Sequence, residues 1–254
     1  MIYLQQMVYN RKLICVLLLL LSVKSYAQYP FEKYPAIKYD SVSIVNHGTE
    51  YHKGFLTTHK KGFRRIATYK SYKLVFLCDS DTLQDGTNAL LYHNGRIIKH
   101  MKLEVSIDDD WFQTPLFIGD IDGNGLPDFK IIIGNNGNGF AASYETKVYL
   151  LNQGNDKFKL ISFMDLFENT ERDFDHDGSY NIIGEEYRAY REHAYLIFNL
   201  YKFKHGKLIN VSKKYNYPIA VPYLYTETYK ATNKIPRRVM KKFLFAQPGV
   251  DHKN

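Results

Sequence analysis

Two short acidic stretches carry the clearest chemical pattern in this chain. Residues 120–128 read DIDGNGLPD, and residues 173–181 read DFDHDGSYN. Each has a carboxylate at positions 1 and 3, Asp or Asn at positions 5 and 9, and Gly at position 6. Each also runs into an apolar, β-like stretch that ends in Gly. Because the pattern recurs in the same context, we interpret the two stretches as repeated cation-binding loops on a β scaffold.

The residue types and their spacing suit calcium. This ion takes about six to eight oxygen ligands from carboxylates, amides, backbone carbonyls and water. Alternate residues of a tight loop can turn their side chains inward, and the glycine at position 6 permits the sharp turn. The predicted ligands of a first ion are Asp120, Asp122, Asn124, the backbone carbonyl of Leu126, and Asp128. Those of a second ion are Asp173, Asp175, Asp177, the carbonyl of Ser179, and Asn181. The asparagine at position 9 of the second loop removes one negative charge, which predicts weaker binding there.

An EF-hand is the obvious alternative for both loops. It requires a bidentate Glu at position 12 and a helix on each side. Position 12 is Ile131 in the first loop and Gly184 in the second, and the flanking residues are β-branched or aromatic, as strands prefer. We therefore reject the EF-hand and predict strands around both loops. An Asp- and Gly-rich turn without a metal is the remaining alternative.

Residues 1–27 have the features of a secretory signal peptide. A basic pair precedes the apolar run from Leu13 to Val23, and Ser25-Tyr26-Ala27 offers small residues for cleavage before Gln28. The apolar run is shorter than the roughly 20 residues of a transmembrane helix. We expect an exported protein that is periplasmic, on the cell surface or extracellular. Retention of the segment as an uncleaved anchor is the alternative.

We find no catalytic motif in the remainder of the chain and therefore expect a protein without catalytic activity. It contains no nucleophile elbow, no phosphate-binding glycine loop and no zinc-protease motif. Cys78 is the single cysteine after the signal segment, which excludes an intramolecular disulfide. Without the three basic residues of the signal segment, the formal net charge falls from +8 to 31 − 26 = +5. We interpret this modest charge as an ordinary basic surface, with attraction to anionic polymers or membrane surfaces as the alternative. We expect a protein or polysaccharide partner and no nucleic acid.

The chain also carries a longer repeat around the acidic loops. Turn glycines follow strand-like segments at spacings of 47, 59 and 52 residues, and the acidic loops begin 34 and 33 residues before the last two. These glycines are Gly48, Gly95, Gly154 and Gly206. A period near 50 with several strands per unit suggests propeller blades or a related array. We predict an all-β fold: a small or incomplete β-propeller-like array of about four antiparallel sheets, with a short C-terminal helix within 235–243.

A family resemblance supports this organisation. Residues 119–134, followed by Val148-Tyr-Leu-Leu-Asn and Gly154, resemble an FG-GAP (VCBS-type) repeat, a calcium-bearing blade of integrin-like β-propellers. Residues 173–184 resemble a second, degenerate copy. The resemblance implies that eight side chains ligate calcium, namely Asp120, Asp122, Asn124, Asp128, Asp173, Asp175, Asp177 and Asn181. The predicted segments after the signal are degenerate β repeats in 28–114, two calcium-loop repeats in 115–212, and a closing segment with a tail in 213–254.

The expected function is that of a non-catalytic module that binds a macromolecule and uses two calcium ions structurally. One alternative is an inhibitor or immunity-type protein against a lysozyme-like hydrolase, in which Ile107 to Pro115 would enter the enzyme cleft. A carbohydrate-binding or carbohydrate-processing protein is a further alternative. It would require carboxylates or aromatic side chains that converge on one pocket.

Overall fold

The computed structural model describes residues 29–47, 63–78, 87–103, 115–134, 143–166, 169–204, 206–223 and 235–248. These residues form three antiparallel sheets and a short C-terminal helix. The prediction of an all-β fold of antiparallel sheets with a short helix near the C-terminus is therefore confirmed. The predicted signal segment lies outside the described residues, as do residues 107–114 of the loop considered for an inhibitor.

The first sheet is a meander of five strands in chain order. Its strands are β1 (Ser43–His47), β2 (Phe63–Tyr69), β3 (Tyr72–Cys78), β4 (Thr87–His93) and β5 (Arg96–Leu103). The turn between β4 and β5 consists of Asn94 and Gly95, with φ angles of 49° and 79°. A tight two-residue hairpin needs positive φ at both central positions, which explains the Asn-Gly pair.

The second and third sheets carry the acidic loops. The second contains β6 (Leu116–Gly119), β7 (Asp128–Gly134), β8 (Tyr144–Asn152) and β9 (Phe158–Leu166), in chain order. The third contains β10 (Asn181–Tyr190), β11 (His193–Lys204), β12 (Lys207–Asn210) and β13 (Ile219–Pro222). Strands β12 and β13 pair with different parts of β11. The first acidic loop joins β6 to β7, and the second leads directly into β10.

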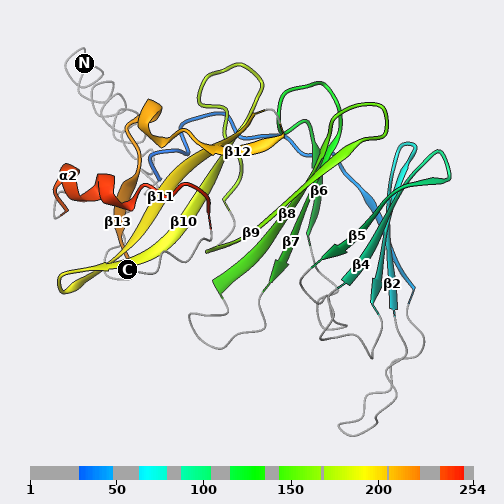
Figure 1. Ribbon diagram of the computed structural model, residues 1–254, viewed down its shortest axis with the longest axis horizontal. Helices are drawn as coiled ribbons and strands as arrows, with labels where there is room; N and C mark the ends of the chain where they lie inside the picture. Colours follow the sequence, from blue (N-terminus) through cyan, green and yellow to red (C-terminus); the bar gives the residue numbers. More distant parts are fainter. Residues whose placement is uncertain are drawn as a thin grey trace, which may run out of the picture.

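The three sheets follow one another across the molecule in the order of the sequence (Figure 1). Alternate residues of a strand point to opposite faces, so the middle sheet can pack on both neighbours. Phe129 and Val148 belong to a buried apolar cluster with Leu74 of the first sheet. Tyr149 and the other side chains of the opposite face cluster with Ile182 and further residues of the third sheet. Both acidic loops therefore rest on packed sheet interfaces.

Two buried ion pairs accompany this apolar packing. The ammonium of Lys130 lies 2.8 Å from Glu171, and that of Lys147 lies 2.7 Å from Asp165, with all four side chains fully buried. Burial disfavours the ionised form of Glu171, but the charge and hydrogen bond of Lys130 outweigh it and lower the pKa of this carboxyl. Removal of one partner from such a pair leaves an uncompensated buried charge.

The C-terminal helix is short. Its α-helical part, α2 (Arg237–Met240), continues into a 3-10 turn, η5 (Lys241–Phe243), and a separate 3-10 turn, η4 (Ser212–Tyr215), precedes β13. Met240 packs with Tyr195 and Ile197 of β11. Within the part of the chain that the structure describes, no helix is long and apolar enough to cross a membrane.

Candidate metal centre

The first acidic loop makes its turn with two glycines in the left-handed region. Gly123 and Gly125 have φ angles of +78° and +81°. A Cβ on Gly123 would lie 2.8 Å from the Cβ of Ser179 in the second acidic loop. The amide of Tyr180 also donates a hydrogen bond of 3.0 Å to the carbonyl of Ile121. The two loops are therefore in direct contact, and Gly123 is required for their close approach.

Three carboxylates converge in the first loop. Asp120, Asp122 and Asp128 each offer one oxygen, and these oxygens all lie within 4.8 Å of one another. Across the described ranges, this is the only group of three or more acidic, His or Cys side chains with that geometry. The three residues are positions 1, 3 and 9 of the predicted calcium loop. The structure thus brings together the carboxylate ligands that the sequence pattern predicts for the first ion.

Hydrogen bonds from the backbone hold the outer carboxylates in place. The two oxygens of Asp120 accept hydrogen bonds from the amides of Asn124 and Gly125, at 2.9 and 2.8 Å. Asp128 is fully buried. One of its oxygens accepts bonds from the amides of Ile121 and Asp122, and the other accepts a bond of 2.8 Å from the amide of Asn152. These bonds fix the loop ends and tie the site to the end of β8.

The charge of this cluster is poorly compensated by the residues that the structure describes. Burial raises the pKa of Asp122, and it raises the pKa of Asp128 to about 7. The Oδ1 atom of Asp122 is buried and accepts no hydrogen bond. Among the described residues, no lysine or arginine forms a salt bridge with these three carboxylates. The cluster therefore has an oxygen available for a cation and a net charge that a cation would neutralise.

The side chain of Asn124, a further predicted ligand of the first ion, takes other contacts. The side-chain oxygen of Asn124 accepts a hydrogen bond of 2.8 Å from the amide of Leu126. Its amide nitrogen donates one of 2.6 Å to the carbonyl of Asn152. Asn152 thus contacts both position 5 and position 9 of the loop, a role that the sequence pattern did not indicate. The loop and the β8–β9 hairpin form one hydrogen-bonded unit.

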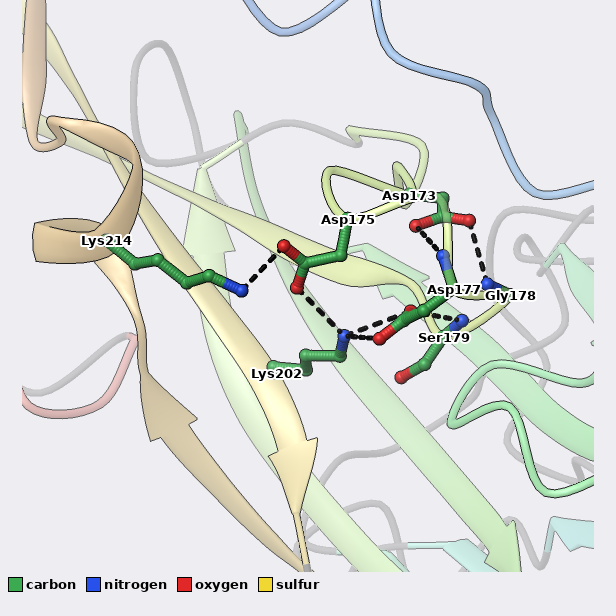
Figure 2. Close-up of polar contacts among 7 residues, drawn as sticks. All are labelled: Asp173, Asp175, Asp177, Gly178, Ser179, Lys202 and Lys214. Carbon is green, nitrogen blue, oxygen red and sulfur yellow. Dashed lines mark hydrogen bonds and ion pairs between the residues drawn. The ribbon is translucent and has the colours of Figure 1, made fainter.

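The second loop has the same backbone turn (Figure 2). The oxygens of Asp173 accept hydrogen bonds from the amides of Asp177 and Gly178, at 3.2 and 2.9 Å. The side chain of Asp177 accepts one of 2.9 Å from the amide of Ser179. These bonds match those that Asp120 and Asn124 make in the first loop. The repeated sequence pattern therefore produces a repeated local structure.

The charges around the second loop differ from those around the first. The ammonium of Lys202 lies 2.9 Å from one oxygen of Asp177 and 3.4 Å from Asp175, and that of Lys214 lies 2.6 Å from Asp175 (Figure 2). The hydrogen bond from Lys202 lowers the pKa of Asp177. Partial burial opposes ionisation of Asp175, but the hydrogen bonds from Lys214, Tyr215 and Lys202 prevail and lower its pKa to about 2.

Position 9 of the second loop also differs. Asn181 is fully buried, and neither the nitrogen nor the oxygen of its side-chain amide has a hydrogen-bond partner. In β10 it lies directly opposite Lys202 of β11. The predicted ligands of the second ion thus lie along one loop. Two of the three carboxylates of that loop, Asp175 and Asp177, already contact the ammonium groups of lysines.

Comparison with known proteins identifies no relative: no protein-family model, curated protein or solved structure matches the chain.

Proposed function

We propose that the first acidic loop binds one calcium ion that stabilises the junction of β6 and β7. The convergence of Asp120, Asp122 and Asp128, with one oxygen from each within 4.8 Å of the others, carries this proposal. Carboxylate oxygens are the ligands that calcium prefers, whereas structural zinc sites use Cys and His. A calcium ion would neutralise three crowded carboxylates and use the unpartnered Oδ1 of Asp122.

The role of this ion is structural. Asp128 is the first residue of β7, and its carboxylate also contacts the end of β8 through the amide of Asn152. A cation held by Asp128 together with Asp120 and Asp122 would join the end of β6, the loop and the start of β7. Because the second loop packs on Gly123, ordering of the first loop would also order its neighbour.

We further propose that the protein is an exported calcium-binding β-repeat protein of the FG-GAP (VCBS-type) kind that binds a protein or polysaccharide without catalysis. The resemblance of residues 119–134 to that repeat supports this proposal, as does a structure built from consecutive antiparallel sheets. In such an arrangement, sheets supply a rigid scaffold and loops supply the contacts with a partner.

Thermal unfolding in calcium and in chelator tests the calcium site. A ligand at about 100 times its dissociation constant stabilises the folded state by about 2.7 kcal/mol. For a chain of this size, that corresponds to a rise in melting temperature of roughly 5–10 °C. The double variant D120N/D122N is expected to lose this rise. The control variant E192Q, which neutralises an exposed carboxylate in the β10–β11 turn, is expected to keep it. Equal melting temperatures of the unmodified protein in calcium and in chelator would refute the proposal.

A further inference from the structure

We propose that the second acidic loop carries its own cation: the ammonium groups of Lys202 and Lys214 take the place of a calcium ion. The loop then folds without metal, and the chain binds one calcium ion rather than two. This inference rests on the proposed function only in using the first loop as its calcium-binding reference.

The two loops differ in charge and not in backbone conformation. Asp173 and Asp120 both accept hydrogen bonds from the amides of positions 5 and 6, at 2.8–3.2 Å. Position 5 accepts a bond from the amide of position 7 in both loops, at 2.8 Å in the first and 2.9 Å in the second. The same turn therefore forms in both repeats. The residues around each loop determine which positive charge neutralises its carboxylates.

Lys202 is placed as a bridging cation. Its ammonium lies within 3.4 Å of three carboxylate oxygens, two from Asp177 and one from Asp175. An ammonium group has three hydrogen-bond donors, so these contacts use its full capacity. The Lys202 side chain is only 18% exposed, which limits competition from water. Lys214, from the 3-10 turn η4, adds a bond of 2.6 Å to the second oxygen of Asp175.

The strand register explains why the first loop has no equivalent lysine. Lys202 lies opposite Asn181, the last residue of the second loop and the first of β10. In the second sheet, Phe129 pairs with Leu150, so the residue corresponding to Lys202 is Leu151, which is buried and apolar. The two repeats thus differ at this position, which is Leu151 in the first and Lys202 in the second. This difference gives the second loop a positive charge from the chain itself, which the first loop does not receive from the corresponding position.

Charge balance gives the expected difference in metal binding. The first loop presents three carboxylates without a paired cation in the described part of the chain. The second loop also has three carboxylates, from Asp173, Asp175 and Asp177, but it has two adjacent ammonium groups and an uncharged Asn181 at position 9. A calcium ion entering the second loop would have to displace Lys202. With every group ionised, the second loop and its two lysines have a formal charge of −1, whereas the three carboxylates of the first loop have a formal charge of −3.

The number of calcium ions bound, measured by equilibrium dialysis and titration calorimetry on the chain from Gln28 onward, tests this inference. We expect one ion in the unmodified protein, none in D120N/D122N, and one in D177N. Loss of an ion in D177N would overturn the inference. Two ions in the unmodified protein, with one remaining in D120N/D122N, would also overturn the inference. A single ion in the unmodified protein that persists in D120N/D122N would instead refute the proposed function of the first loop, so the two failures are distinguishable.

Removal of the internal cation provides the complementary test. We expect the variant K202M to melt at a lower temperature than the unmodified protein in chelator, and calcium to restore its stability through a second bound ion. The variant K202R, which keeps the charge, is expected to bind a single ion. If K202M does not fold in chelator but folds in calcium, the inference is supported. If K202M folds and binds no additional ion at any calcium concentration tested, the inference is refuted.

Discussion

Asp122 and Asp175 occupy position 3 of their loops, and replacing each with asparagine should have opposite consequences. The substitution preserves size and removes one negative charge. Asp122 lies in the cluster that has no paired lysine or arginine among the described residues, and its buried Oδ1 accepts no hydrogen bond, so the substitution relieves repulsion and removes no contact of that oxygen. Asp175 is bonded to Lys202 and Lys214, so its replacement removes the partner of two ammonium groups.

The magnitude for D122N follows from the spacing of the carboxylates. Two unit charges 4.8 Å apart repel each other by about 1 kcal/mol in water and about 3.5 kcal/mol at an effective dielectric constant near 20. The site is partly buried, so we expect D122N to increase the stability of the calcium-free protein by about 1–2 kcal/mol. In calcium, the same variant should be less stable than the unmodified protein, because a charged ligand is lost.

The matched variant D175N should behave differently. Partly exposed ion pairs contribute about 0.2–1 kcal/mol each, so the loss of two should reduce stability by about 1 kcal/mol, equally in calcium and in chelator. Urea unfolding followed by circular dichroism, in both conditions, measures these differences. A loss of stability in calcium-free D122N, or an effect of D175N that depends on calcium, would contradict the difference in charge between the two loops.

Three further variants test the surroundings of the site. Burial raises the pKa of Glu185 to about 8, from an ordinary 4.5. The folded state therefore keeps a proton that the unfolded state loses, and the stability of the protein falls as the pH rises from about 4.5 to about 8. The urea midpoint of E185Q should fall less steeply over this pH range than that of the unmodified protein. K130M should destabilise the protein by about 3–5 kcal/mol in thermal unfolding by leaving Glu171 unpaired, and K130M/E171Q should recover part of this loss. G123A should cost more than G125A in unfolding free energy, because both have positive φ but only Gly123 faces an atom within 4 Å; equal costs would contradict the contact between the loops.

The local features of this chain could be predicted from its sequence. The nine-residue pattern gave the two turns and the three carboxylates of the first loop, because alternate loop residues and a glycine at position 6 determine the local geometry. The Asn94-Gly95 turn between β4 and β5 is likewise a local feature, because these two residue types tolerate positive φ. Strand-like segments between regularly spaced glycines predicted the all-β class. In each case the information lies within a few neighbouring residues.

The contacts that the sequence analysis missed come from distant residues. Lys202 meets Asp177 across 25 positions and Lys214 meets Asp175 across 39, so a search for ligands within each loop could not find them. The correspondence of Lys202 with Leu151 follows from the strand registers, because the loop and the turn glycine of the two repeats are separated by different numbers of residues. Lys130 was also missed as a buried residue, because lysine is rarely buried unless its charge is paired, and its partner Glu171 lies on a segment remote in sequence.

Calorimetric titration of calcium into the chain from Gln28 onward, compared with the same titration of D120N/D122N, tests the central claim most directly. We expect a single binding site in the unmodified protein and no binding in the double variant. Absence of binding in the unmodified protein, or unchanged binding in the double variant, would contradict a calcium site built from Asp120, Asp122 and Asp128.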